Sequence, residues 1–190
     1  MLEIKNLHSG YGAFNVLFGV NIEINQTDWI SLIGTNGAGK STLLKTIMGI
    51  YKPTKGEIWF QGTNITALKP HEIYRLGVGF LAEGHPVFPN LTVKENLELG
   101  GIAVKLSAHR QNQKLEEMFT LFPFLKQRLK QRAGTFSGGE QQLLSLARCL
   151  MTSPKLILCD EPTLGLAPLM VKEFFSILKN LHLHETTVLL

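Results

Sequence analysis

The sequence lacks the features of a membrane-spanning, secreted or disulfide-bonded protein. Its 190 residues include only two cysteines, Cys149 and Cys159, which lie in apolar runs without the paired spacing of a zinc site or redox motif. No uninterrupted apolar segment approaches bilayer length, and the N-terminus has no basic stretch followed by an apolar core. We therefore expect a cytoplasmic protein with buried free thiols.

The sequence also lacks a concentrated block of one charge. Its formal net charge is +4 and its pI is about 9.1, but Lys and Arg are interleaved with Asp and Glu. The densest basic run, residues 126–132, is interrupted by Gln and Leu, which favours a solvated helix face. Charge alone does not decide the kind of partner, and no nucleic-acid partner is expected on the further grounds given below. Without repeats or linkers, residues 1–190 are expected to form a single domain with room for a small inserted subdomain.

Residues 30–42 join a short apolar segment to a glycine-rich loop and a helix start. Ile30–Ile33 is the expected strand, and the pattern G-x-x-x-x-G-K-[ST] follows it. Such a loop points backbone N–H groups at a phosphate, and the helix beginning near Ser41 adds the positive end of its dipole. Lys40 is expected to contact the β- and γ-phosphates and to act in catalysis, and Ser41 to bind Mg²⁺. A plain glycine-rich turn is the alternative. The expected ATP-binding residues of this loop are Gly34, Asn36, Gly37, Ala38, Gly39, Lys40, Ser41 and Thr42.

A pair of carboxylates follows the buried apolar run at residues 156–159. Ligands of open parallel sheets bind beyond the carboxyl ends of the strands, so Asp160 and Glu161 are expected beside the phosphate loop. Asp160 is then a Mg²⁺ ligand, and Glu161 is a catalytic residue that orients or deprotonates the attacking water. The alternative is a surface turn ended by Pro162.

Hydrophobic periodicity predicts an α/β fold with a largely parallel sheet. Apolar and polar residues alternate near the N-terminus, which indicates an antiparallel β-layer. A helical subdomain is expected over about Leu91 to Arg132, opened by Thr92 and Glu95 as a capping box. Further strands are expected at residues 58–60, 78–81, 156–159 and 187–190, and further helices at 43–48, 143–151 and 169–181.

One segment identifies a family among the phosphate-loop ATPases. Residues 136–142, Phe-Ser-Gly-Gly-Glu-Gln-Gln, closely resemble the signature loop of ABC-type ATPases. The resemblance extends over residues 2–190 and implies a head-to-tail dimer that encloses two ATP molecules. Ser137, Gly138 and Gly139 would then face the γ-phosphate held by a second ATP-binding subunit. Without the family, the same residues are read as a simple helix N-cap.

A narrower resemblance is to the ATP-binding subunit of branched-chain amino-acid importers, with urea and amide importers as near relatives. It lies in residues 82–89 and 164–168. It implies that Tyr11 stacks on adenine, although a half-exposed tyrosine at a strand end is the alternative. It also implies that Glu83 occupies the place of the Gln that senses Mg²⁺ and contacts the permease. The resemblance thus implies an ATP-hydrolysing subunit on the inner face of the cell membrane, working with separate permease subunits.

Two departures from the family pattern qualify these expectations. Ala167 stands where many members have an Asp, and members continue past the last strand into a switch loop, so we expect the sequence to be C-terminally incomplete. A nucleotide-binding module with little hydrolysis therefore stays open as an alternative. So does a soluble ABC ATPase that acts on nucleic acid or ribosomes without a permease, although the chain lacks the long insertion or dense basic arms expected of one.

Overall fold

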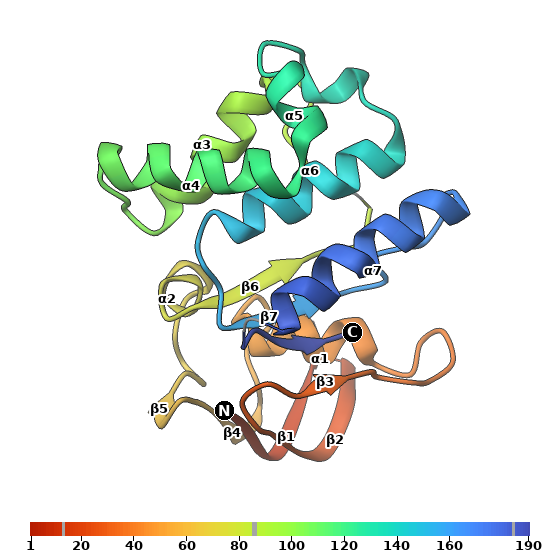
Figure 1. Cartoon of the computed structure of the whole chain (residues 1–190). Helices are drawn as coiled ribbons and strands as arrows, with labels where there is room; N and C mark the ends of the chain where they lie inside the picture. Colours follow the sequence, from red (N-terminus) through yellow and green to blue (C-terminus); the bar gives the residue numbers. More distant parts are fainter. Residues whose placement is uncertain (13, 85–86, 184) are drawn as a thin grey trace.

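A computed structural model describes residues 1–12, 14–84, 87–183 and 185–190, which form two four-stranded sheets (Figure 1). The first sheet is antiparallel and has the order β2-β1-β4-β5. The second is parallel and has the order β3-β8-β7-β6. The predicted α/β class, with an N-terminal antiparallel layer and a parallel core sheet, is confirmed. The strands are β1 (Leu2–Tyr11), β2 (Phe14–Ile24), β3 (Trp29–Ile30), β4 (Lys55–Phe60), β5 (Thr63–Asn64), β6 (Val78–Leu81), β7 (Leu156–Cys159) and β8 (Thr187–Leu189).

Helices occupy the space between the sheets and the far side of the parallel sheet. Figure 1 shows α1 between the two sheets, and α3 to α6 on the side of the parallel sheet away from the antiparallel one. The helices are α1 (Lys40–Ile47), α2 (Pro70–Arg75), α3 (Val93–Ala103), α4 (Ala108–Leu121), α5 (Pro123–Gln127), α6 (Gly138–Leu150) and α7 (Pro168–Leu183), with a 3-10 turn at Ala133–Thr135. Helices α3 to α5 lie within the range predicted for a helical subdomain; its status as a subdomain of a single domain stays a prediction.

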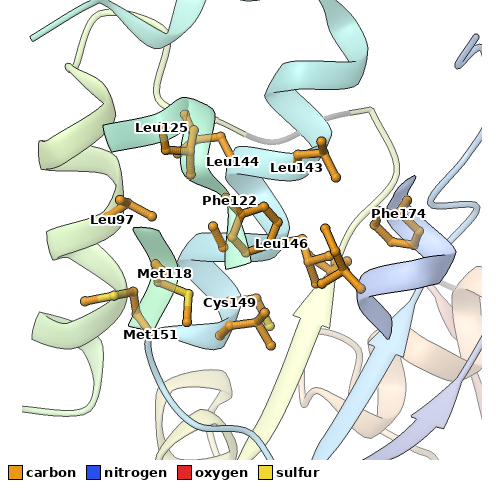
Figure 2. Packing of buried hydrophobic residues seen from close by; sticks show 14 of the residues in the cluster. Leu97, Met118, Phe122, Leu125, Leu143, Leu144, Leu146, Cys149, Met151 and Phe174 are labelled. Carbon is orange, nitrogen blue, oxygen red and sulfur yellow. The ribbon is translucent and has the colours of Figure 1, made fainter. Parts of the chain in front are cut away.

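Each face of the parallel sheet has its own hydrophobic core. Apolar residues of α1 and the antiparallel sheet pack on one face. On the other face, residues of α3 to α7 form the core seen in Figure 2, where Leu97, Phe122, Leu146 and Phe174 come from four parts of the chain. Because both faces are covered, β7 is buried at every position, which explains its uninterrupted apolar sequence.

Both cysteines are free and buried, as the sequence predicts. Cys149 lies on α6 and Cys159 at the end of β7. Burial raises the pKa of the Cys149 thiol to about 12. Because the thiolate is the reactive form, both side chains act as small apolar groups of the core.

The expected strand at Ile30–Ile33 is wrong in its extent. Strand β3 covers only Trp29–Ile30, and Ile33 is 96% exposed. The Leu32 N–H still donates to the Leu190 carbonyl at 2.6 Å, but β8 itself extends only to Leu189. Strand β3 pairs in parallel with β8, with Trp29 opposite Val188 and Ile30 opposite Leu189.

Helix α3 packs on α6 through a glycine, and this contact gives a stability prediction. A Cβ at Gly100 would lie 2.3 Å from the Arg148 carbonyl oxygen and 2.8 Å from Met151 Cβ. At Gly101 the nearest atom would be Gln111 Oε1 at 3.1 Å, the end of a flexible side chain. We expect Gly100→Ala to lower the free energy of unfolding by about 2 kcal/mol, because backbone atoms must move apart.

Gly101→Ala is the matched control, since it makes the same change one residue along the same helix. The gain in helix propensity, up to about 1 kcal/mol, should leave its stability unchanged or raised. Urea unfolding followed by circular dichroism measures both variants. Equal unfolding midpoints for the two would contradict the close α3–α6 contact.

Candidate nucleotide-binding site

The loop before α1 has a backbone that requires glycine at two positions. Gly37 and Gly39 have φ values of 84° and 95°, which residues with a side chain rarely adopt. Gly39 is also the N-cap of α1, and no side chain among the described residues caps this helix. The first N–H groups of α1 are therefore available to an anion.

Lys40 is the first residue of α1, and its side chain folds back over the loop. The Nζ atom donates to the carbonyl oxygens of Gly34 at 2.9 Å and Thr35 at 3.2 Å. A second loop contact joins the Ala38 N–H to the Thr35 carbonyl at 3.1 Å. The ammonium group thus lies across the glycine-rich loop, where a phosphate group can replace the carbonyl oxygens as its partner.

Ser41 and Asp160 meet although 119 residues separate them. The Ser41 hydroxyl donates to Asp160 Oδ1 at 2.7 Å. Asp160 directly follows β7, and its backbone N–H donates to the Leu81 carbonyl of the neighbouring strand at 2.9 Å. The parallel pairing of β6 with β7 therefore holds the Asp160 carboxylate at the carboxyl edge of the sheet, next to the start of α1.

The Asp160 carboxylate has an oxygen that suits a cation. Asp160 is 1% exposed, and its Oδ2 atom is buried with no hydrogen-bond partner among the described residues. A buried, unpaired carboxylate oxygen is costly unless a cation or donor joins it. Together with the Ser41 hydroxyl, it forms a set of oxygen donors of the kind that Mg²⁺ prefers. The described residues contain no group of three or more His, Cys, Asp or Glu that could hold a metal ion by itself.

Glu161 has a strained backbone. Its φ of 46° lies in the left-handed region, which costs a residue with a side chain on the order of 1 kcal/mol. Strain of this kind persists where the surrounding structure fixes the chain, and here it brings Glu161 to the wall of the same pocket as Lys40 and Ser41.

A pocket of about 400 Å³ brings most of the predicted site residues together. Tyr11, Glu83 and Glu161 line it with the phosphate loop, although they come from distant parts of the sequence. The lining residues are Tyr11, Val16, Asn36, Gly37, Gly39, Lys40, Ser41, Thr42, Glu83, Glu161 and Leu164. Val16 and Leu164 were not predicted; only the folding of β2 over Gly39 reveals Val16, since a Cβ at Gly39 would lie 3.1 Å from Val16 Cγ1.

Other predicted residues lie outside this lining. Asp160 lines an adjoining cavity of about 280 Å³, which Lys40 and Glu161 also border. Gly34 and Ala38 belong to the loop but are not in the wall of the pocket. His85 and Pro86, in the predicted importer-like segment 82–89, lie outside the described residues.

Tyr11, which lines the pocket, also lies in a group of aromatic rings. Its ring centroid is 6.4 Å from that of Tyr51 and 6.5 Å from that of Phe14, both in tilted arrangements. Tyr11 remains 55% exposed, so part of the ring is open to a ligand. This geometry suits stacking on a nucleobase, and it equally fits a half-exposed tyrosine at a strand end.

The predicted signature loop, Ser137 to Gly139, is not among the described residues that line the pocket. Ser137 is the N-cap of α6, and its hydroxyl accepts from the Glu140 N–H at 3.3 Å. The Glu140 Oε2 atom in turn accepts from the Ser137 N–H at 2.9 Å, which completes a capping box. The N-cap interpretation therefore describes the loop in this chain, and a contact with nucleotide would need a second subunit.

A phosphate loop opening α1, with an aspartate at the end of the parallel strand β7, defines a phosphate-loop nucleotide-binding domain. The family model for the ABC transporter family matches residues 17–164, and the chain belongs to this family. The predicted ABC-type resemblance is confirmed. The chain is thus an ATP-binding cassette of a family that hydrolyses ATP.

The chain is similar to named branched-chain amino-acid transport proteins. It is 41% identical over 190 residues to the high-affinity branched-chain amino acid transport ATP-binding protein BraG of Pseudomonas aeruginosa, covering 100% of this chain and 81% of that protein. It is 36% identical over 176 residues to the probable branched-chain amino acid transport ATP-binding protein LivF of Archaeoglobus fulgidus, covering 93% of this chain and 74% of that protein.

Solved structures show the same fold. A nucleotide-free ATP-binding cassette from an ABC transporter superposes with a TM-score of 0.85 at 32% identity, covering 100% of this chain and 79% of that one. A dimeric cassette in a post-hydrolysis state, bound to ADP and Pi, superposes with a TM-score of 0.86 at 28% identity, covering 100% of this chain and 86% of that one. Cassettes of this family thus form dimers. None of the described helices of the present chain is long and apolar enough to cross a bilayer.

Proposed function

We propose that this chain binds MgATP in the pocket at the phosphate loop and hydrolyses it, energising the import of branched-chain amino acids or related small solutes through a separate permease. The observation that carries the proposal is the meeting of the phosphate loop with Asp160 and Glu161 at one site, although 119 residues separate Ser41 from Asp160. The likeness to two branched-chain amino acid transport proteins supports the solute class.

In this proposal, the loop N–H groups and Lys40 hold the phosphates. The Lys40 ammonium leaves the carbonyl oxygens of Gly34 and Thr35 and pairs with the β- and γ-phosphates. Ser41 and Asp160 hold Mg²⁺, which supplies positive charge that neutralises the phosphate oxygens. Tyr11 stacks on the adenine, and Glu83 lies at the γ-phosphate end of the pocket.

Glu161 is the proposed general base. Its carboxylate orients a water molecule and accepts a proton as the water oxygen bonds to the γ-phosphorus, while the bond to the bridging oxygen breaks and ADP departs. The position of Glu161 in the wall of the pocket that Lys40 and Ser41 also line supports this role.

A second ATP-binding subunit, identical or homologous, completes the proposed site. Ser137, Gly138 and Gly139 of each subunit face the γ-phosphate held by the other in this proposal. Solved structures of similar cassettes that are dimeric support the presence of a second subunit. Closing on ATP and opening after hydrolysis drive the permease, because the two states differ in affinity for nucleotide. The contact surface is the Glu83 loop with the helices of residues 91–132, at the inner face of the cell membrane.

Reconstitution tests the proposed function. The chain is co-expressed with any permease subunits that are encoded beside its gene, and the purified complex is placed in vesicles together with any solute-binding protein encoded there. We expect ATP-dependent uptake of leucine, isoleucine or valine that Lys40→Ala abolishes. Uptake of urea or short amides instead would correct the solute class. The absence of any copurifying permease would contradict the transport role.

A further inference from the structure

Arg128, the residue after α5, contacts one residue before Ser137 and one residue after it in the signature loop. Its Nη1 atom donates to Glu140 Oε1 at 2.5 Å, and its guanidinium carbon lies 5.5 Å from the centre of the Phe136 ring. Phe136 precedes Ser137, and Glu140 follows it by three residues. Phe136 is 5% exposed, so its ring is a fixed surface for the guanidinium group.

The Glu140 carboxylate is bound to Ser137 at the same time. Its Oε2 atom accepts from the Ser137 N–H at 2.9 Å and from the Ser137 hydroxyl at 3.0 Å. Although burial raises the pKa of Glu140, the hydrogen bonds from Ser137 and the guanidinium group of Arg128 lower it below its usual value overall. The carboxylate therefore carries a full negative charge beside the Ser137 hydroxyl at neutral pH.

This charge conflicts with the proposed role of Ser137. A hydroxyl that donates to a phosphate must turn its hydrogen away from Glu140, and an uncompensated carboxylate next to it would repel the phosphate. Arg128 opposes both effects. It cancels the negative charge, and by sharing the carboxylate it weakens the hold of Glu140 on the hydroxyl hydrogen.

We propose that Arg128 is a positioning residue for the signature loop: it neutralises Glu140 and so allows Ser137 to donate to the phosphate held by a second subunit. The inference rests on the proposed function, because it requires ATP to be enclosed between two cassettes. Arg128 itself touches neither the nucleotide pocket nor the reacting atoms of its own subunit.

The experiment uses the full chain carrying Glu161→Gln, so that the dimer formed with MgATP does not hydrolyse its nucleotide. Light scattering measures the MgATP concentration at which half of the protein is dimeric. With Arg128→Gln we expect this concentration to rise about tenfold, equivalent to about 1.4 kcal/mol. Binding of a fluorescent ADP analogue to the monomer should be unchanged, because Arg128 lies outside its pocket.

Lys126→Gln is the matched control. Lys126 lies two residues away, forms an ion pair with Glu116 at 3.0 Å, and is 5.6 Å from the centre of the Phe119 ring. It therefore has the same kinds of contact as Arg128, but not with the signature loop. We expect Lys126→Gln to dimerise at the parental MgATP concentration.

The double variant Arg128→Gln with Glu140→Gln separates charge compensation from a merely structural role. Glutamine at the third helical position can still complete a capping box and carries no charge. We expect the double variant to return to within about threefold of the parent, or about 0.65 kcal/mol. Dimerisation as weak as with Arg128→Gln alone would overturn the proposal, as would parental behaviour of Arg128→Gln.

Arg128→Lys keeps the test decisive if Arg128→Gln does not fold. Lysine retains the positive charge on which the proposal depends and loses the planar guanidinium group that lies over Phe136. Because charge compensation needs only the charge, this variant should stay within about threefold of the parent. A tenfold weakening with lysine would overturn charge compensation. If the Glu161→Gln parent binds MgATP but never dimerises, the proposed function is contradicted and this inference loses its basis. If the parent dimerises and every Arg128 variant dimerises equally well, only the inference is contradicted.

Discussion

Lys40→Ala protein is expected to bind MgATP about 100-fold more weakly than the unaltered chain, because losing one partner of a desolvated charge pair costs several kcal/mol. In the structure, the Lys40 ammonium has only the carbonyl oxygens of Gly34 and Thr35 as hydrogen-bond partners within the described chain. It can therefore transfer to the phosphates without breaking an ion pair. Isothermal titration calorimetry with MgATP measures the change.

Lys45→Ala is the control for the first prediction. Lys45 lies on the same helix, in its last turn, and is not among the described residues that line the pocket. The Lys45→Ala substitution removes the same charge from the protein as Lys40→Ala does, so a general electrostatic effect on MgATP affinity would appear in both variants. Equal affinities of the two variants for MgATP would contradict the assignment of Lys40 to the phosphates.

Glu161→Gln protein is expected to lose about 100- to 1,000-fold in kcat while its affinity for MgATP stays within about threefold, since general-base catalysis contributes about 10²–10⁴-fold. Glutamine has nearly the same shape as glutamate, and the left-handed backbone conformation at this position costs about the same free energy for either residue. The substitution thus removes proton acceptance and little else. Steady-state phosphate release gives kcat, and calorimetry gives the affinity.

Glu173→Gln, on the exposed side of α7, controls for the loss of one negative charge. It should release phosphate at the rate of the unaltered chain. Two results would argue against a general base at Glu161: turnover that survives the Glu161→Gln substitution, or a loss of turnover that a matching loss of MgATP affinity explains.

The sequence predicts elements best where local signals agree. Strands β6 and β7 have the predicted bounds, because each is a short apolar run that the sheet buries. The capping box of Thr92 and Glu95 is also confirmed, with the Glu95 N–H donating to the Thr92 hydroxyl oxygen at 3.2 Å. In these segments, residues close together in the sequence are sufficient to predict the structural element.

Prediction fails where contacts with a segment distant in sequence determine the local structure. Val16 enters the pocket wall only because β2 folds over Gly39. The Arg128–Glu140 ion pair joins residues 12 apart across a turn, and no helical or strand period indicates it. The roles of the individual site residues stay predictions until the variants are measured.

The hydrogen bond between Ser41 and Asp160 has a consequence for biosynthesis. The phosphate loop leaves the translation machinery long before its aspartate, since 119 residues separate them. At about 5–20 residues per second, the nascent loop waits roughly 6–24 seconds for that partner. During this interval the proposed Mg²⁺ site lacks its aspartate, so the site is complete only after β7 has been made and has joined the sheet.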